Sequence, residues 1–175
     1  MIVRIIPMVF LFCLAFSVSA QELLKLRPSP LAIASMRYQD HYVKITYSQP
    51  QMKNREIFGH LVPFGKVWRT GANEATEITT TKDIQIDGIV LRAGTYSLLT
   101  IPEKDTWTII INADIGMWGA YNYNPQKDIW RFDVPVQSND KIYEPFTIIF
   151  DQRNDVADLL IMWDNVKVSI PIKLL

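Results

Sequence analysis

Residues 75–102, ATEITTTKDIQIDGIVLRAGTYSLLTIP, decide the fold class of this chain. Ile78, Ile84 and Ile86 share one parity, while polar residues, Thr79 and Thr81 among them, occupy the other. This is the two-residue period of a half-buried β-strand. Asp87-Gly88 stands between two such runs, and both residue types tolerate the positive φ that a two-residue hairpin turn requires. The stretch therefore predicts a strand, a tight turn and a second strand.

The same alternation continues outside this stretch. Residues 36–47 alternate around a turn-like Gln39-Asp40-His41 and predict a hairpin. Four further runs have the composition of strands, and we expect the last of them to reverse direction at Asp164-Asn165. These runs are residues 105–115, 128–137, 144–153 and 157–175. No long window sustains a period of 3.6 residues, so we expect no helix longer than about three turns.

Short strands separated by Gly, Pro, Asn and Asp predict an all-β domain. A single antiparallel β-sandwich of jelly-roll-like type is our preferred architecture, and a closed barrel is the alternative. One long loop region, around residues 49–74, has no strand pattern. Loops of that length are usually functional, or are packed down by their own apolar side chains.

The first twenty residues have the pattern of a secretory signal peptide. Arg4 precedes an apolar run over residues 5–16, and the small residues Val18 and Ala20 follow at the spacing that signal peptidase recognises. The apolar run is shorter than the roughly 18 residues that a membrane span needs. We therefore expect cleavage after Ala20 and export to the periplasm or the medium, with no membrane span left in the mature chain.

The rest of the chain divides into a short linker and one domain. Residues 21–30 are charged and bounded by prolines, as linkers often are, and residues 31–175 form the predicted single domain. Cleavage removes Arg4 and Cys13, which leaves 17 basic and 18 acidic residues, a formal charge of 17 − 18 = −1, and no cysteine. Core packing must then hold the fold without disulfides. The balanced charge argues against nucleic acid as a partner.

The most unusual passage is GKVWRTGANEAT, residues 65–76. Gly65 and Gly71 permit backbone torsions that other residues avoid, and Asn73 tolerates the left-handed region. We therefore expect a sharply turned, fixed loop around Arg69-Thr70.

Two compatible interpretations of this loop stay open. In the structural one, which we favour because buried loops need polar partners, Trp68 fills the core, Arg69 pairs with Glu74, and the Asn73 side chain satisfies backbone groups. Arg69→Ala would then cost several kcal/mol, because it removes one partner of a buried pair. In the other interpretation, the Arg fork, the Asn amide and exposed N–H groups converge on an anionic or sugar ligand.

A second cluster, WGAYNYN at residues 118–124, has three aromatic residues and two amides. Aromatic rings offer flat apolar area and amides offer hydrogen bonds, which suits a carbohydrate face or a peptide groove. Such residues also pack across the mouth of a sandwich, and the sequence does not separate these roles.

Catalytic and metal-binding patterns are weak. The only histidines are His41 and His60, too few for a zinc site, and no Gly-x-Ser-x-Gly elbow occurs. Glu74 and Glu77 stand three residues apart, which on a regular strand places them on opposite faces. We therefore predict no metal and no cofactor.

Five segments together resemble the bacterial exported family known as domain of unknown function 2911, common in Bacteroidetes. They are SPLA (29–32), ITYSQP (45–50), IFGHLVPFGKVWRTGANEAT (57–76), LRAGTYSLLTIP (91–102) and WGAYNYNPQKD (118–128). The resemblance covers nearly the whole chain after residue 28, in order. It implies an exported, mostly β domain, and it brings no known activity and no catalytic residue.

From the residues we expect a non-catalytic binding module of the cell envelope for a glycan, a peptide or a small anionic ligand. The alternative is a hydrolase or isomerase in which Arg69 and Glu74 act as an electrostatic and acid–base pair and Asn73 orients the substrate. The candidate ligand-binding residues are Lys66, Trp68, Arg69, Thr70, Asn73, Glu74, Trp118, Tyr121, Asn122 and Tyr123.

Overall fold

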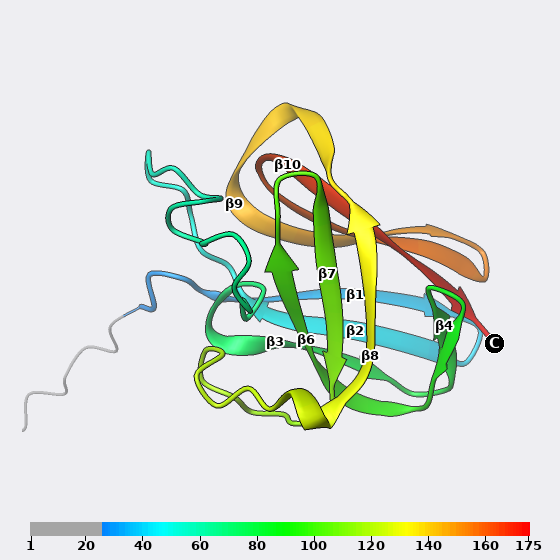
Figure 1. Cartoon of the computed structure of the whole chain (residues 1–175). Helices are drawn as coiled ribbons and strands as arrows, with labels where there is room; N and C mark the ends of the chain where they lie inside the picture. Colours follow the sequence, from blue (N-terminus) through cyan, green and yellow to red (C-terminus); the bar gives the residue numbers. More distant parts are fainter. Residues whose placement is uncertain (1–25) are drawn as a thin grey trace, which may run out of the picture.

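The computed structural model describes residues 26–175 (Figure 1). The predicted signal peptide, its cleavage site and the first half of the predicted linker lie outside the described residues. The described chain is all β apart from a short 3-10 turn, η1, at Pro125–Lys127. Its strands are β1 (Leu31–Tyr38), β2 (His41–Ser48), β3 (Ala72–Thr80), β4 (Ile84–Ile86), β5 (Ile89–Leu91), β6 (Gly94–Pro102), β7 (Thr106–Asn112), β8 (Asp128–Pro135), β9 (Gln137–Arg153) and β10 (Val156–Leu174).

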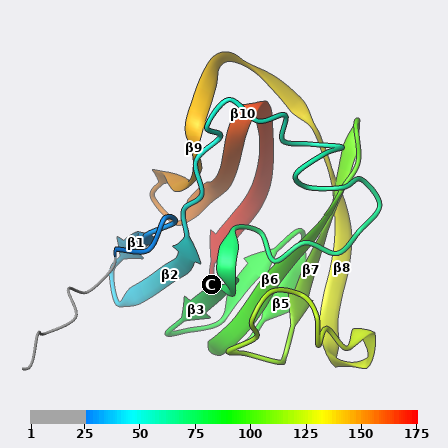
Figure 2. The same ribbon diagram turned by 90° about the vertical axis from the view of Figure 1, so that its left-hand side faces the viewer.

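The strands form two antiparallel sheets, as predicted for a sandwich. The larger sheet has the order β1-β2-β3-β6-β7-β8, and the smaller one has the order β5-β4-β10-β9. Figure 2 shows the larger sheet bending from β1 and β2 round to β8, with β10 facing its inner side. The sheets do not close into a barrel, so the alternative architecture is excluded.

The two predicted hairpins are present. β1 and β2 are joined at Gln39-Asp40, where Gln39 has a φ of 52°. β4 and β5 are joined by Asp87-Gly88, with φ values of 47° and 79°. Positive φ at both central residues is the torsion pattern that matches the natural twist of paired strands.

The predicted reversal at Asp164-Asn165 is wrong. β10 runs through these residues without turning back, and Asp164 has a φ of 55°. The register between β10 and β9 shifts on both sides of Asp164, which marks a β-bulge. Asp tolerates the left-handed region both in turns and in bulges. The Asp-Asn pair therefore marks a residue with positive φ, but here that residue lies in a bulge and not in a turn.

The core lies between the sheets and is rich in aromatic side chains. Trp68 and Trp163 stack with their ring planes 13° apart and their centroids 6.0 Å apart. Phe58 packs against both of these rings and also against Trp107. Phe58 and Trp68 belong to the long segment between β2 and β3, which is therefore packed down by its own apolar side chains.

We expect Phe58→Ala to lower the free energy of unfolding by about 3 kcal/mol, the usual cost of removing a large aromatic side chain from a packed site. Leu61→Ala is the control on the same segment, because the Leu61 side chain is 42% exposed. Urea unfolding monitored by tryptophan fluorescence measures both. Equal, small losses would show that the segment is not part of the core.

Candidate ligand-binding cleft

Trp68 fixes the loop at residues 65–76 onto the larger sheet. Its N–H donates to the Thr100 carbonyl at 2.7 Å, and its own carbonyl accepts from the Thr100 N–H at 3.0 Å. Its indole N–H donates to the Gly71 carbonyl at 3.1 Å, which closes the turn. The predicted core role of Trp68 is confirmed, since the side chain is buried in the main cluster.

The backbone turns where the sequence predicted it. Thr70, Gly71 and Asn73 all have positive φ, at 55°, 154° and 55°. A Cβ on Gly71 would lie 2.8 Å from the Ser48 carbonyl oxygen, so this position needs glycine for space as well as for torsion.

Thr70 lies inside the protein and faces no ligand surface. Its side chain is fully buried, and its hydroxyl lies 3.1 Å from the Thr100 hydroxyl. The Thr76 hydroxyl donates to the Thr70 carbonyl at 2.6 Å, and the Thr76 N–H donates to the Arg69 carbonyl at 3.0 Å. These bonds satisfy the backbone of the turn, which gives Thr70 a structural role.

The predicted ion pair between Arg69 and Glu74 is wrong. The Glu74 carboxylate instead accepts from Nη1 of Arg27, at 2.8 and 2.9 Å, and from the Ser48 hydroxyl at 3.4 Å. Its own backbone N–H, and then Arg27, lower the pKa of this carboxyl below its usual value. Arg27 stands 47 residues from Glu74 in sequence. The local spacing of Arg69 and Glu74 does not indicate that Arg27 binds the same carboxylate.

The Arg69 side chain is half-buried and has no ion pair or hydrogen bond to another described residue. Its Nε is shielded from solvent and lacks a hydrogen-bond partner within residues 26–175. Burial lowers the pKa of this guanidinium, and the nearby Tyr121 phenol partly offsets the effect. Arg69 is therefore a partly desolvated cation without a described anion beside it.

Arg69 lines a cleft of about 390 Å³ together with two other cations, Arg55 and Lys66. No Asp or Glu is among the described residues that line it. Nε and Nη2 of Arg55 donate to the Met52 carbonyl at 2.8 Å and to the Gln51 carbonyl at 2.5 Å. Arg55 is thus fixed by its own loop, whereas the Lys66 side chain is exposed. The cleft carries a concentrated positive charge.

Asn73 also lines the cleft, but its amide group has a structural function. Nδ2 donates to the Ser29 carbonyl at 3.2 Å and to the Ser48 hydroxyl at 3.3 Å. The side chain therefore ties the segment before β1 to the end of β2. This supports the structural interpretation of Asn73, in which its amide satisfies the backbone.

The aromatic segment at residues 118–124 lies beside this loop, as the binding hypothesis required. The Gly119 N–H donates to the Asn73 carbonyl at 2.9 Å, and Trp118 forms a β-bridge with Glu74. Tyr121 is 85% exposed and lines a second hollow of about 190 Å³ with Arg69. Trp118 and Asn122 are exposed as well, but neither lines this hollow or the cleft.

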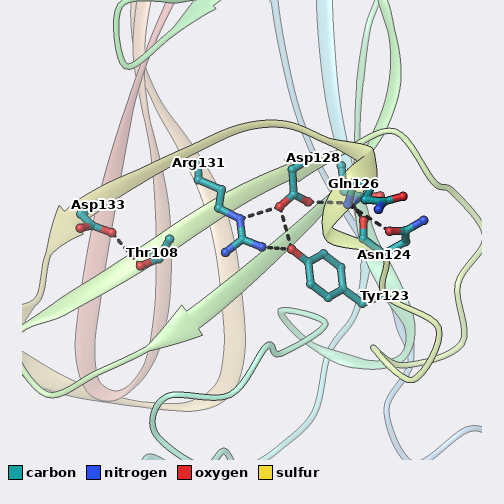
Figure 3. A network of polar contacts seen from close by, with 8 residues as sticks. Thr108, Tyr123, Asn124, Gln126, Asp128, Arg131 and Asp133 are labelled. Atoms are coloured by element: carbon teal, nitrogen blue, oxygen red, sulfur yellow. Dashed lines mark hydrogen bonds and ion pairs between the residues drawn. The ribbon is translucent and has the colours of Figure 1, made fainter.

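Tyr123 belongs to a separate polar network on β7 and β8 (Figure 3). Its hydroxyl donates to Oδ2 of Asp128 at 2.7 Å, and Arg131 donates both to that carboxylate and to the phenol oxygen. The Asn112 amide donates to the other Asp128 oxygen at 2.7 Å. These bonds place Tyr123 in a structural role away from the cleft.

Glu74 and Glu77 do not lie on opposite faces as strict alternation predicted. Ser48 pairs with Ala72 while Thr46 pairs with Glu77, so β3 has a bulge between these pairs. Both glutamates consequently line one hollow of about 240 Å³. Glu74 thus belongs to a different hollow from Arg69.

The sequence patterns did not identify Arg55 at the cleft or Arg27 beside Glu74. Arg55 lies within the predicted long loop, and its position among the few basic residues there was the signal that could have found it. Arg27 was assigned to a linker, and no pattern in the sequence connects it with Glu74. Within residues 26–175, no group of three or more His, Cys, Asp or Glu is placed to hold a metal ion.

The fold and the cleft define a two-sheet β protein with a cationic cleft that is lined largely by the segment between β2 and β3. The chain belongs to the family described as protein of unknown function DUF2911, whose profile matches residues 29–172. The resemblance inferred from the sequence motifs is therefore confirmed. No curated protein and no solved structure matches the chain. Among the described residues, no helix has the length and apolar character to cross a membrane.

We expect Gly71→Ala to lower the free energy of unfolding by about 2–4 kcal/mol, because the methyl group meets the Ser48 carbonyl and the backbone must leave its torsion. Gly116→Ala is the matched control: its φ is 68°, but a Cβ there meets nothing within 4 Å. That control costs only the torsional strain of about 1–2 kcal/mol. Denaturant unfolding of both variants measures the difference, and equal losses would contradict the tight contact at Gly71.

We expect one tyrosine to ionise only at strongly alkaline pH. Burial, followed by the Asp128 carboxylate, raises the pKa of Tyr123 to about 12. The raised pKa favours the neutral phenol in the folded state, so this stabilisation is complete below about pH 10 and is lost as the pH rises through 12. Phenolate absorbance should lose this last step in Tyr123→Phe and keep it in Tyr121→Phe. A last step unaffected by Tyr123→Phe would contradict the assignment.

Proposed function

We propose that this protein is an exported, non-catalytic binding module whose cleft holds the anionic group of a glycan, a peptide or a small molecule. The sequence supports export through its signal-peptide pattern. The cleft supports anion binding through its charge and through its size, which falls within the range of about 300–1,000 Å³ that small-molecule sites occupy.

The observation that carries this proposal is the state of Arg69. Partial burial of a cation costs desolvation free energy, and without a counter-charge no ion pair offsets that cost. A guanidinium is also a fork of donors that matches carboxylate, sulfate and phosphate oxygens. An arriving anion would supply the partner that the described residues do not provide.

The two other cations would strengthen such binding in different ways. Arg55 is held by two loop carbonyls, so its charge is positioned before the ligand arrives and little side-chain entropy is lost on binding. Lys66 lies exposed on the cleft, where it would attract an approaching anion and raise the association rate.

Binding is a better account of this site than hydrolysis or isomerisation. The catalytic alternative needs Arg69 and Glu74 to act on one substrate, but Glu74 is paired with Arg27 and lines a different hollow. Its backbone N–H and Arg27 lower the pKa of the Glu74 carboxyl, which favours the ionised form and disfavours a role as general acid.

We expect Arg69→Met to leave stability within about 1 kcal/mol of the wild type, because no described ion pair is lost. The same variant should lose most of its affinity for inorganic sulfate, since the partnering donor fork is gone. Arg92→Met is the control: it removes the same charge from an exposed position outside the cleft.

Isothermal titration with sodium sulfate and urea unfolding measure both quantities. A loss of several kcal/mol in Arg69→Met with unchanged sulfate affinity would restore the structural interpretation of Arg69. Equal sulfate affinity in the wild type and in both variants would remove the proposed anion site.

A further inference from the structure

Arg69 lines both the cleft and the Tyr121 hollow. Both are lined by Val67, Trp68 and Arg69, so these residues form the boundary that the two spaces share. The cleft continues from there toward Arg55, and the smaller hollow continues toward Tyr121. Because Arg69 and Tyr121 line the same smaller hollow, a ligand there whose anionic group binds Arg69 can also contact the Tyr121 ring.

Tyr121 has the exposure and the support of a stacking platform. Tyr121 is 85% exposed, and it lines the same hollow as the core residue Trp68. A Cβ placed on Gly119 would lie 2.8 Å from Cε2 and 2.9 Å from Cδ2 of Tyr121, so this side of the ring lies against Gly119. One side of the ring is thus supported, and most of its surface remains open to a ligand.

On the basis of the proposed function, we propose that the ligand is a saccharide with an acidic substituent, a uronate or a sulfate ester. Its acidic group binds Arg69, and the apolar face of its sugar ring packs on Tyr121. The volume of about 190 Å³ beside Tyr121 suits a single ring-sized group. The exposed Asn122 amide is adjacent in sequence and offers a hydrogen-bonding partner for hydroxyl groups.

Other anionic ligands fit less well. A nucleobase pocket usually holds its base between aromatic or apolar side chains on both sides, whereas Tyr121 is the one exposed ring among the described residues of this hollow. An extended peptide commonly binds by adding a strand to a free sheet edge. Here β3 lies between β2 and β6, and the Trp68 backbone is already paired with Thr100, so the site offers no free edge.

The test is isothermal titration of protein purified after expression of the full chain. The probes are sodium sulfate, cellobiose, digalacturonate, a monosulfated disaccharide and uridine monophosphate. We expect one or both acidic disaccharides to bind about tenfold more tightly than sulfate, which corresponds to one good aromatic contact. The two disaccharides distinguish a uronate from a sulfate ester as the acidic group.

The variants Tyr121→Ala and Tyr121→Phe separate the ring from the hydroxyl. Tyr121→Ala should lower the affinity for the acidic disaccharide to the affinity for sulfate. Tyr121→Phe should retain most of the difference in affinity between the two ligands. Because Tyr121 is exposed, neither variant should unfold the protein, and the affinity for sulfate provides a check on the folded site.

Each result has a distinct meaning. If sulfate binds through Arg69 but the acidic disaccharides bind no more tightly, the saccharide inference is wrong and the anion-binding function stands. The inference is also overturned if Tyr121→Ala lowers the affinity for uridine monophosphate more than the affinity for the acidic disaccharides. It is overturned as well if cellobiose binds as tightly as the acidic sugars. If no probe depends on Arg69, the proposed function fails as well.

Discussion

The stacking of Trp68 on Trp163 is the contact on which the rest of the structure depends. Trp163 comes from the smaller sheet and Trp68 from the long loop, which is itself hydrogen-bonded to β6 of the larger sheet. One pair of rings therefore joins three parts of the chain. The described residues contain no cysteine, so burial of this aromatic cluster holds these parts together without a disulfide among them.

The positions of the charged groups at the site follow from that contact. Because Trp68 points into the core and its backbone pairs with Thr100, its neighbours Val67 and Arg69 are directed to the other side of the strand-like segment. Arg69 is thereby held at the boundary of two hollows. Glu74 lies beyond the turn at Gly71 and Asn73, where its carboxylate forms an ion pair with Arg27 and not with Arg69.

The sequence predicted the features that depend on neighbouring residues. Strand alternation, the Asp87-Gly88 hairpin and the sharp turn at Gly71 all express local torsional and packing preferences, and these predictions are confirmed. The errors came where a local pattern has two physical outcomes. Asp164 has the same torsion in a bulge as in a turn, and the five-residue spacing of Arg69 and Glu74 allowed a pair that a distant arginine prevented. Side chains from distant segments decide such competitions, and a single sequence does not reveal them.

The shared use of Trp68 and Trp163 by the core and by the cleft has an evolutionary consequence. Both rings border the cleft while they also hold the sheets together, so a substitution there changes the ligand surface only at the expense of the fold. Lys66 and Tyr121 are exposed and are not part of the packed core, so their substitution does not disturb the fold in this way. Descendants of this protein can therefore acquire new ligand preferences by exchanging these exposed residues, while the two buried tryptophans stay unchanged.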